Sequence, residues 1–146
     1  MPVMVIGADT EAGLAIIGDL IQPGREVRAF VSNPDIGVML KERGAKVALG
    51  DVSDDSHIEG AALHCFTAVL VTEAARDDRE RAFARTESDV LEAWGRAVVN
   101  AHVHRVIWIY DGEPPRVEVP ETATVSPSDP DLARRVADLD DARVIS

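Results

Sequence analysis

The chain contains one cysteine, Cys65, and two lysines among its 146 residues. One cysteine excludes an internal disulfide and any metal site built from several cysteines. No apolar run approaches the roughly 20 residues that a membrane-spanning helix needs. The N-terminus also lacks the basic start and long apolar stretch of a signal peptide, so we expect a cytoplasmic protein and no membrane partner.

Basic residues are scarce relative to acidic ones. The sequence has 15 lysines and arginines against 26 aspartates and glutamates, a net charge of −11. Nucleic acids bind through basic patches, so no nucleic-acid partner is expected. The length predicts a single domain over residues 1–146, large enough to bury a stable core.

Short β-rich runs alternate with helical stretches through the first 111 residues. Strands are expected at Val3–Ile6, Glu26–Val31, Lys46–Leu49, Phe66–Thr72 and Arg105–Tyr110. Helices are expected at Ala12–Gln22, from Pro34 to Arg43 after an N-cap at Asn33, from a Ser53 cap to His64, and at about Asp77–Ala101. This alternation predicts an α/β fold with a doubly wound parallel sheet, Rossmann-like, in strand order 3-2-1-4-5-6.

The pattern changes after Tyr110. Residues 113–131 hold five of the eight prolines and no apolar period, which predicts an irregular Pro-rich loop, either a functional lid or a mobile segment. A last helix at about Pro130–Leu139 and a sixth strand at Arg143–Ile145 are expected to follow.

The first strand runs directly into Gly7-Ala8-Asp9-Thr10-Glu11-Ala12-Gly13. In a dinucleotide-binding turn, the first glycine makes the turn, the second admits the pyrophosphate and the third packs helix on strand. Gly7 and Gly13 fill the first and third places, and Thr10 replaces the second. The Thr10 hydroxyl can donate to a phosphate. Asp9 and Glu11 can instead stabilise the helix N-terminus by themselves, so a binding loop and a self-capped relic both remain possible.

Four stretches together resemble the NmrA-like, NAD(P)H-binding atypical short-chain dehydrogenases/reductases. Their order and spacing match over about residues 1–111, and the third is the most specific. They read VIGADTEAG, EVRAFVSNPD, GAKVALGDVSDDSHIEGAALHCFTAVLVT and NAHVHRVIWIYD.

The resemblance implies a cofactor site at the carboxyl ends of the strands. Gly7, Thr10 and Gly13, with Asp9, Glu11 and Ala12 in the same loop, would line the pyrophosphate. Ser32 and Asn33 would meet the adenosine ribose, Asp51 and Val52 the adenine, and Thr72 and Glu73 the middle of the cofactor. An acid at the end of the second strand selects NAD and an arginine selects NADP. Because Ser32 stands there, the cofactor is NADP or NAD, with a slight lean to NADP.

Two departures from the family concern catalysis. Many relatives use a tyrosine with a lysine four residues later, whereas Tyr110 is followed at that spacing by Pro114. Tyr110 is therefore a weak catalytic candidate, as a general acid without a neighbouring cation. The family's C-terminal substrate region is also missing, so a substrate pocket would come from the Pro-rich stretch or from a second subunit.

We assign no catalytic or metal-binding role to the histidines at 102 and 104 or to the single cysteine. His102 and His104 would share a strand face, but without a third ligand we predict no metal site. Cys65 precedes a buried strand and is expected to be a small buried side chain. An apolar stripe on the long helix, which includes Phe83 and Trp94, packs on the sheet or forms a homodimer interface anchored by Trp94.

Two functions follow from the sequence. The first is an NAD(P)-binding protein of atypical reductase type without a full substrate domain. The second is a degenerate, non-enzymatic Rossmann module that acts in protein interaction or nucleotide sensing.

Overall fold

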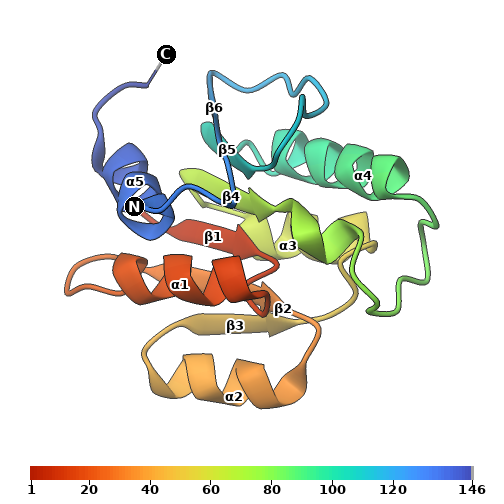
Figure 1. Ribbon diagram of the computed structural model, residues 1–146, viewed down its shortest axis with the longest axis horizontal. Coiled ribbons are helices and arrows are strands. Elements are labelled where there is room, and N and C mark those ends of the chain that lie inside the picture. The colour runs from red at the N-terminus through yellow and green to blue at the C-terminus, as the bar shows by residue number, and fades with distance from the viewer. Residues whose placement is uncertain (146) are drawn as a thin grey trace.

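The computed structural model describes residues 1–145 and contains one six-stranded parallel sheet (Figure 1). The strand order is β3-β2-β1-β4-β5-β6, which confirms the predicted topology. The strands are β1 (Val3–Ile6), β2 (Val27–Val31), β3 (Lys46–Leu49), β4 (Thr67–Val71), β5 (Arg105–Ile109) and β6 (Glu121–Val125). Every neighbouring pair is parallel, so the carboxyl ends of all six strands meet at one edge.

Helices cover both faces of this sheet (Figure 1). The helices are α1 (Glu11–Leu20), α2 (Pro34–Glu42), α3 (Asp55–Ala62), α4 (Glu87–Asn100) and α5 (Leu132–Asp141), with a 3-10 turn, η1 (Thr72–Ala75), after β4. One core joins α1, α2 and α5 to the sheet, and the other joins α3 and α4 to its opposite face.

Alternation along the strands supplies both cores. In β1, Val3 and Val5 face α1, whereas Met4 and Ile6 face α3 and α4. All four side chains are fully buried. A strand covered on both faces therefore reads as a continuous apolar run, which is the pattern that identified it.

The sixth strand differs from the prediction. Residues 143–145 form no strand, and β6 lies within the Pro-rich stretch that was expected to be irregular. Only the inward-facing residues of β6 are buried, because it is the edge strand. The sequence of β6 is polar, so the hydrophobic pattern did not predict a strand there. Such patterns are strongest in strands that are covered on both faces.

The long helix also begins later than predicted. Residues 77–86 are not helical, and Thr86 caps α4 by accepting a hydrogen bond from the Asp89 amide. Phe83, placed on the helical stripe, lies outside the helix with 69% of its surface exposed. Ser53 does not cap α3 either, because the Asp54 side chain takes that role.

A buried ion pair fixes the C-terminal segment. The Arg105 side chain is fully buried, and its Nη2 lies 2.7 Å from Oε1 of Glu121. Its guanidinium also donates to the carbonyls of Leu139, Asp140, Ala142 and Arg143. This contact closes the carboxyl end of α5 and ties it to β5.

Candidate dinucleotide site

The first loop keeps the backbone geometry of a phosphate-binding turn. Gly7 adopts a φ of +77°, in the left-handed region that favours glycine. At Gly13 an added Cβ would lie 2.1 Å from the Gly7 carbonyl oxygen, so only glycine allows this approach of helix to turn. These are the first and third glycine roles predicted from the sequence.

Thr10 satisfies the loop internally. Its Oγ1 accepts a hydrogen bond from the Gly13 amide at 2.9 Å and donates to the Gly7 carbonyl at 2.7 Å. The residue is only 4% exposed. The hydroxyl hydrogen is thus already engaged, and Thr10 acts here as the N-cap of α1.

The two acids of the loop point to different places. Glu11 is exposed and lines a cavity beside α1. The Asp9 side chain is only 3% exposed and turns to the end of β2. Its Oδ2 accepts from the amides of Ser32 at 2.8 Å and Asn33 at 3.1 Å. Its Oδ1 accepts from Nη1 of Arg79 at 2.9 Å.

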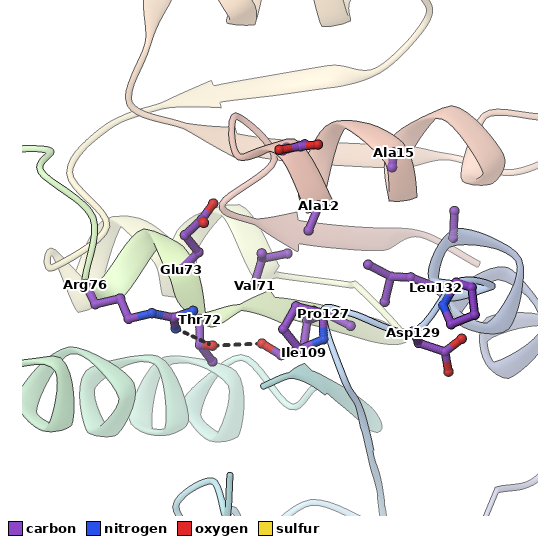
Figure 2. Close-up of a pocket in the computed structure, with 13 residues that line it drawn as sticks. Ala12, Ala15, Val71, Thr72, Glu73, Arg76, Ile109, Pro127, Asp129 and Leu132 are labelled. Carbon is purple, nitrogen blue, oxygen red and sulfur yellow. Dashed lines mark hydrogen bonds between the residues drawn. The ribbon is translucent and has the colours of Figure 1, made fainter. Parts of the chain in front are cut away.

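A cavity of about 430 Å³ lies beside the N-terminal half of α1 (Figure 2). Its walls come from α1, the ends of β4 and β5, η1 and the start of α5. They consist of Glu11, Ala12, Ala15, Val71, Thr72, Glu73, Arg76, Ile109, Pro127, Asp129, Pro130, Leu132 and Ala133. The cavity adjoins the switch point between β1 and β4, where open parallel sheets bind their ligands.

Arg76 is the one cation lining this cavity within residues 1–145. Its Nη1 donates to Oγ1 of Thr72 at 3.2 Å, and Thr72 in turn donates to the Ile109 carbonyl at 2.8 Å (Figure 2). Thr72 is buried while Arg76 is exposed, so the threonine orients a guanidinium that remains open to solvent. Such a group can neutralise an anionic ligand.

A second cavity, of about 780 Å³, lies on the other side of the loop at the ends of β2 and β3. The residues that line it are Asp9, Ser32, Asn33, Pro34, Asp35, Gly50, Asp51, Asp77, Asp78, Arg79 and Glu80. It therefore contains most of the positions that the resemblance assigned to adenosine. Residues 77–80, which the sequence placed on a helix, form one wall.

Hydrogen bonds hold this wall in place. The Ala82 amide donates to Oδ2 of Asp51 at 2.8 Å, and the Phe83 amide donates to Oγ of Ser53 at 3.0 Å. Burial alone would raise the pKa of the Asp51 carboxyl, but hydrogen bonds from Ser53 and Ala82 bring that pKa below its ordinary value. Asp51 is therefore a charged anchor for the segment at neutral pH.

Arg79 and Asp77 form a second anchor. Nη2 of Arg79 lies 2.8 Å from Oδ2 of Asp77, and its Nε lies 2.8 Å from Oδ1. Burial opposes both charges, yet these bonds lower the pKa of Asp77 and raise that of Arg79, to which Asp9 also contributes. The pair stays ionised and keeps Arg79 against Asp9.

The structure gathers most of the predicted positions around these two cavities. Glu11, Ala12, Thr72 and Glu73 line the first, and Asp9, Ser32, Asn33 and Asp51 line the second. Val52 does not join them, because its side chain is fully buried in the core between the sheet and α4.

Tyr110 also lies apart from the first cavity. Tyr110 packs, like Trp108, against the core on the α4 side of the sheet. Ile109, between them, belongs to the opposite core and lines the first cavity. Nothing in the described contacts brings its ring to the loop. The weak catalytic candidate thus gains no support from geometry.

Three other predictions concern residues outside the cavities. Trp94 is fully buried and donates from Nε1 to the Val52 carbonyl at 2.7 Å, so the prediction that it anchors a dimer interface is wrong. His102 and His104 both precede β5, and His104 stacks on Phe66, so they share no strand face. Within residues 1–145, no three His, Cys, Asp or Glu side chains are grouped so that they could hold a metal ion. Cys65 is buried, and burial raises the pKa of its thiol to about 11.

Arg76 and Arg79 were missed as site residues. The mixed-charge run 76–81 reads as a solvated helix start, because nothing local shows that these arginines meet Thr72 and Asp9.

No helix within residues 1–145 is long and apolar enough to cross a membrane.

Comparison with known proteins finds similarity in structure alone. No family model matches the chain, and no curated protein matches it in sequence. Triphenylmethane reductase from Citrobacter sp. superimposes with a TM-score of 0.62 at 17% identity, covering 75% of this chain and 37% of the reductase. A structure of that reductase in complex with NADP(H) gives a TM-score of 0.61 at 18% identity.

Two further solved structures from Escherichia coli show the same likeness. The NADPH-dependent quinone oxidoreductase, complexed with NADPH, has a TM-score of 0.60 at 18% identity over 73% of this chain and 36% of its own. The anaerobilin reductase ChuY, from strain O157:H7, has a TM-score of 0.59 at 18% identity over 76% and 51%. This chain therefore spans between about a third and a half of the length of the proteins it matches.

These likenesses define the class of fold. The chain has the Rossmann-like fold of NAD(P)-binding reductases and nucleoside-diphosphate-sugar epimerases, with matching strand order. At such identities the similarity concerns architecture, and activity must be argued from the site.

Proposed function

We propose that the chain is an NAD(P)-binding module of atypical reductase type. The observation that best supports this proposal is the Gly7–Gly13 turn at the switch point of the sheet, with one cavity on each side of it. A dinucleotide lying across the turn would place its pyrophosphate at the N-terminus of α1, where amide groups favour anions. Its adenosine would occupy the cavity at β2 and β3, and its nicotinamide half the cavity at β4 and β5.

Each named residue has a definite role in this proposal. Gly7 and Gly13 shape the turn, and Ala12 offers its amide without a bulky side chain. Arg76 supplies positive charge beside the pyrophosphate and the nicotinamide ribose, oriented by Thr72. Glu11 and Glu73 bring negative charge to the same cavity and weaken the binding of an anion there. When bound, the nicotinamide would supply hydride chemistry.

The substrate would meet the cofactor at the cavity wall formed by residues 127–133. That wall joins the Pro-rich stretch to α5. Any homodimer would use a surface other than Trp94, since this side chain is fully buried.

Titration by calorimetry with NADH and NADPH tests the proposal. We expect one or both to bind, and no binding of either at millimolar concentration would refute it. Arg76→Gln should weaken binding about tenfold by removing one charge near the phosphates. Arg116→Gln is the matched control, because its side chain is 88% exposed and lies outside both cavities. Glu11→Gln should tighten binding, whereas an unchanged affinity would show that Glu11 does not face the phosphates.

A second candidate is a non-enzymatic Rossmann module. The observation that favours it is the internal satisfaction of the loop, in which Thr10 caps α1 and Asp9 holds the end of β2. This candidate predicts no response to either dinucleotide in the same titration, including with the Glu11→Gln variant.

A further inference from the structure

The end of β2 offers two backbone donors at one point. The amides of Ser32 and Asn33 converge on a single oxygen, Oδ2 of Asp9, at 2.8 and 3.1 Å. The Arg79 guanidinium approaches the same carboxylate through Oδ1 at 2.9 Å and lies 3.3 Å from the Ser32 hydroxyl. Two amides and an arginine are donors that would hold a phosphate, whereas the Ser32 hydroxyl already donates to the Gly50 carbonyl at 3.0 Å.

The chain fills this anion-binding place with its own carboxylate. The Asp9 side chain is 3% exposed, and three hydrogen bonds fix it. The charge of Arg79 is shared, because its Nη2 and Nε bind Asp77 at 2.8 Å each. A phosphate arriving here finds the amides occupied and the guanidinium already paired.

The rest of the cavity adds to this repulsion. Among its lining residues, all within 1–145, six carboxylates stand against one guanidinium, and the carboxylates belong to Asp9, Asp35, Asp51, Asp77, Asp78 and Glu80. In this fold, the end of the second strand is where the adenosine ribose lies, with its 2′-hydroxyl or its 2′-phosphate. A 2′-hydroxyl is neutral and can donate to a carboxylate, whereas a 2′-phosphate carries about two negative charges.

We infer that Asp9 is a specificity-determining residue that excludes the 2′-phosphate and makes the site selective for NAD(H) over NADP(H). The inference rests on the proposed dinucleotide binding. In NAD-binding Rossmann folds the selecting acid stands about the end of the second strand, and here Ser32 occupies that position. The acid is supplied instead from the first loop, so the preference is the reverse of the lean that Ser32 suggested.

The test is the ratio of dissociation constants for NADPH and NADH, measured by calorimetry at one low ionic strength. For the unaltered chain we expect NADPH to bind at least about tenfold more weakly than NADH. Asp9→Asn keeps an acceptor oxygen for the two amides and removes the charge, so the ratio should fall about tenfold. Asp19→Asn, exposed near the other end of α1, is the matched control and should leave the ratio unchanged.

A second variant should shift the ratio of dissociation constants in the opposite direction. It tests the inference even if the Asp9→Asn variant does not fold. Arg79→Gln removes the only positive charge of the cavity lining within residues 1–145, so rejection of NADPH should deepen. If Arg79 were itself the phosphate ligand, the unaltered chain would prefer NADPH and Arg79→Gln would abolish that preference. That result overturns the inference, as does an unchanged ratio in a folded Asp9→Asn variant. Failure of both dinucleotides to bind any variant refutes the proposed function and this inference together.

Discussion

Replacing Gly13 tests the geometry on which the proposed dinucleotide site depends. A Cβ at residue 13 would lie 2.1 Å from the Gly7 carbonyl oxygen and 2.8 Å from Cα of Ala8, both backbone atoms. Restoring an ordinary carbon–oxygen contact would require a backbone shift of more than about 1 Å. We expect Gly13→Ala to lower the free energy of unfolding by about 3 kcal/mol, the upper part of the usual overpacking range.

Gly18 provides a matched control in the same helix. No heavy atom lies within 4 Å of a Cβ added there, and the residue is exposed. Gly18→Ala should therefore raise the free energy of unfolding by about 0.5–1 kcal/mol, the helix propensity difference between the two residues. Urea unfolding followed by far-UV circular dichroism measures both. Equal stabilities for the two variants would refute the close approach of α1 to the turn.

Three further predictions concern stability and reactivity. Arg105→Met should lower the free energy of unfolding by about 3 kcal/mol, because it leaves Glu121 without its buried partner; urea unfolding measures this, and a loss below about 1 kcal/mol contradicts it. The folded-state pKa of Asp51 is lowered, so its contribution to stability is present above its ordinary value of 3.8 and is lost as the pH falls through the folded value. Urea midpoints at about pH 5 and about pH 3 should thus differ more for the unaltered chain than for Asp51→Asn, and equal differences would show that Asp51 anchors nothing. The Cys65 thiol, with a pKa of about 11, should react with a thiol reagent only after unfolding, and rapid labelling of the native chain would contradict its burial.

The sequence predicted the elements whose positions depend mainly on neighbouring residues. β1 and β4 are covered on both faces, so their sequences are continuously apolar and their positions were predicted within a residue or two. The cap at Asn33 before Pro34 was also predicted, because the N-cap contact joins neighbouring residues. Strand order followed from the rules for crossover connections, which depend on the order of elements alone.

The errors arose where distant contacts decide the structure. Residues 77–86 carry a helical pattern, yet Asp9 holds Arg79 from 70 positions away in the sequence. Instead of a helix, this segment forms a wall of the second cavity, where the Ala82 amide donates to Asp51. These two residues are far apart in the sequence, so the local pattern does not reveal the contact. Similarly, β6 is a polar edge strand whose identity depends on pairing with β5.

The two acids of the first loop show how a motif can change its chemistry while keeping its shape. The sequence places Asp9 and Glu11 on either side of Thr10 in the first loop, and their charges are equivalent at that level. In the folded chain only Glu11 lines the cavity beside α1, while Asp9 turns to the amides at the end of β2. In the proposed binding mode, charge at the pyrophosphate and charge at the ribose would therefore be controlled by separate residues. Substitution of Glu11 should change the affinity for both dinucleotides alike, and substitution of Asp9 should change the choice between them.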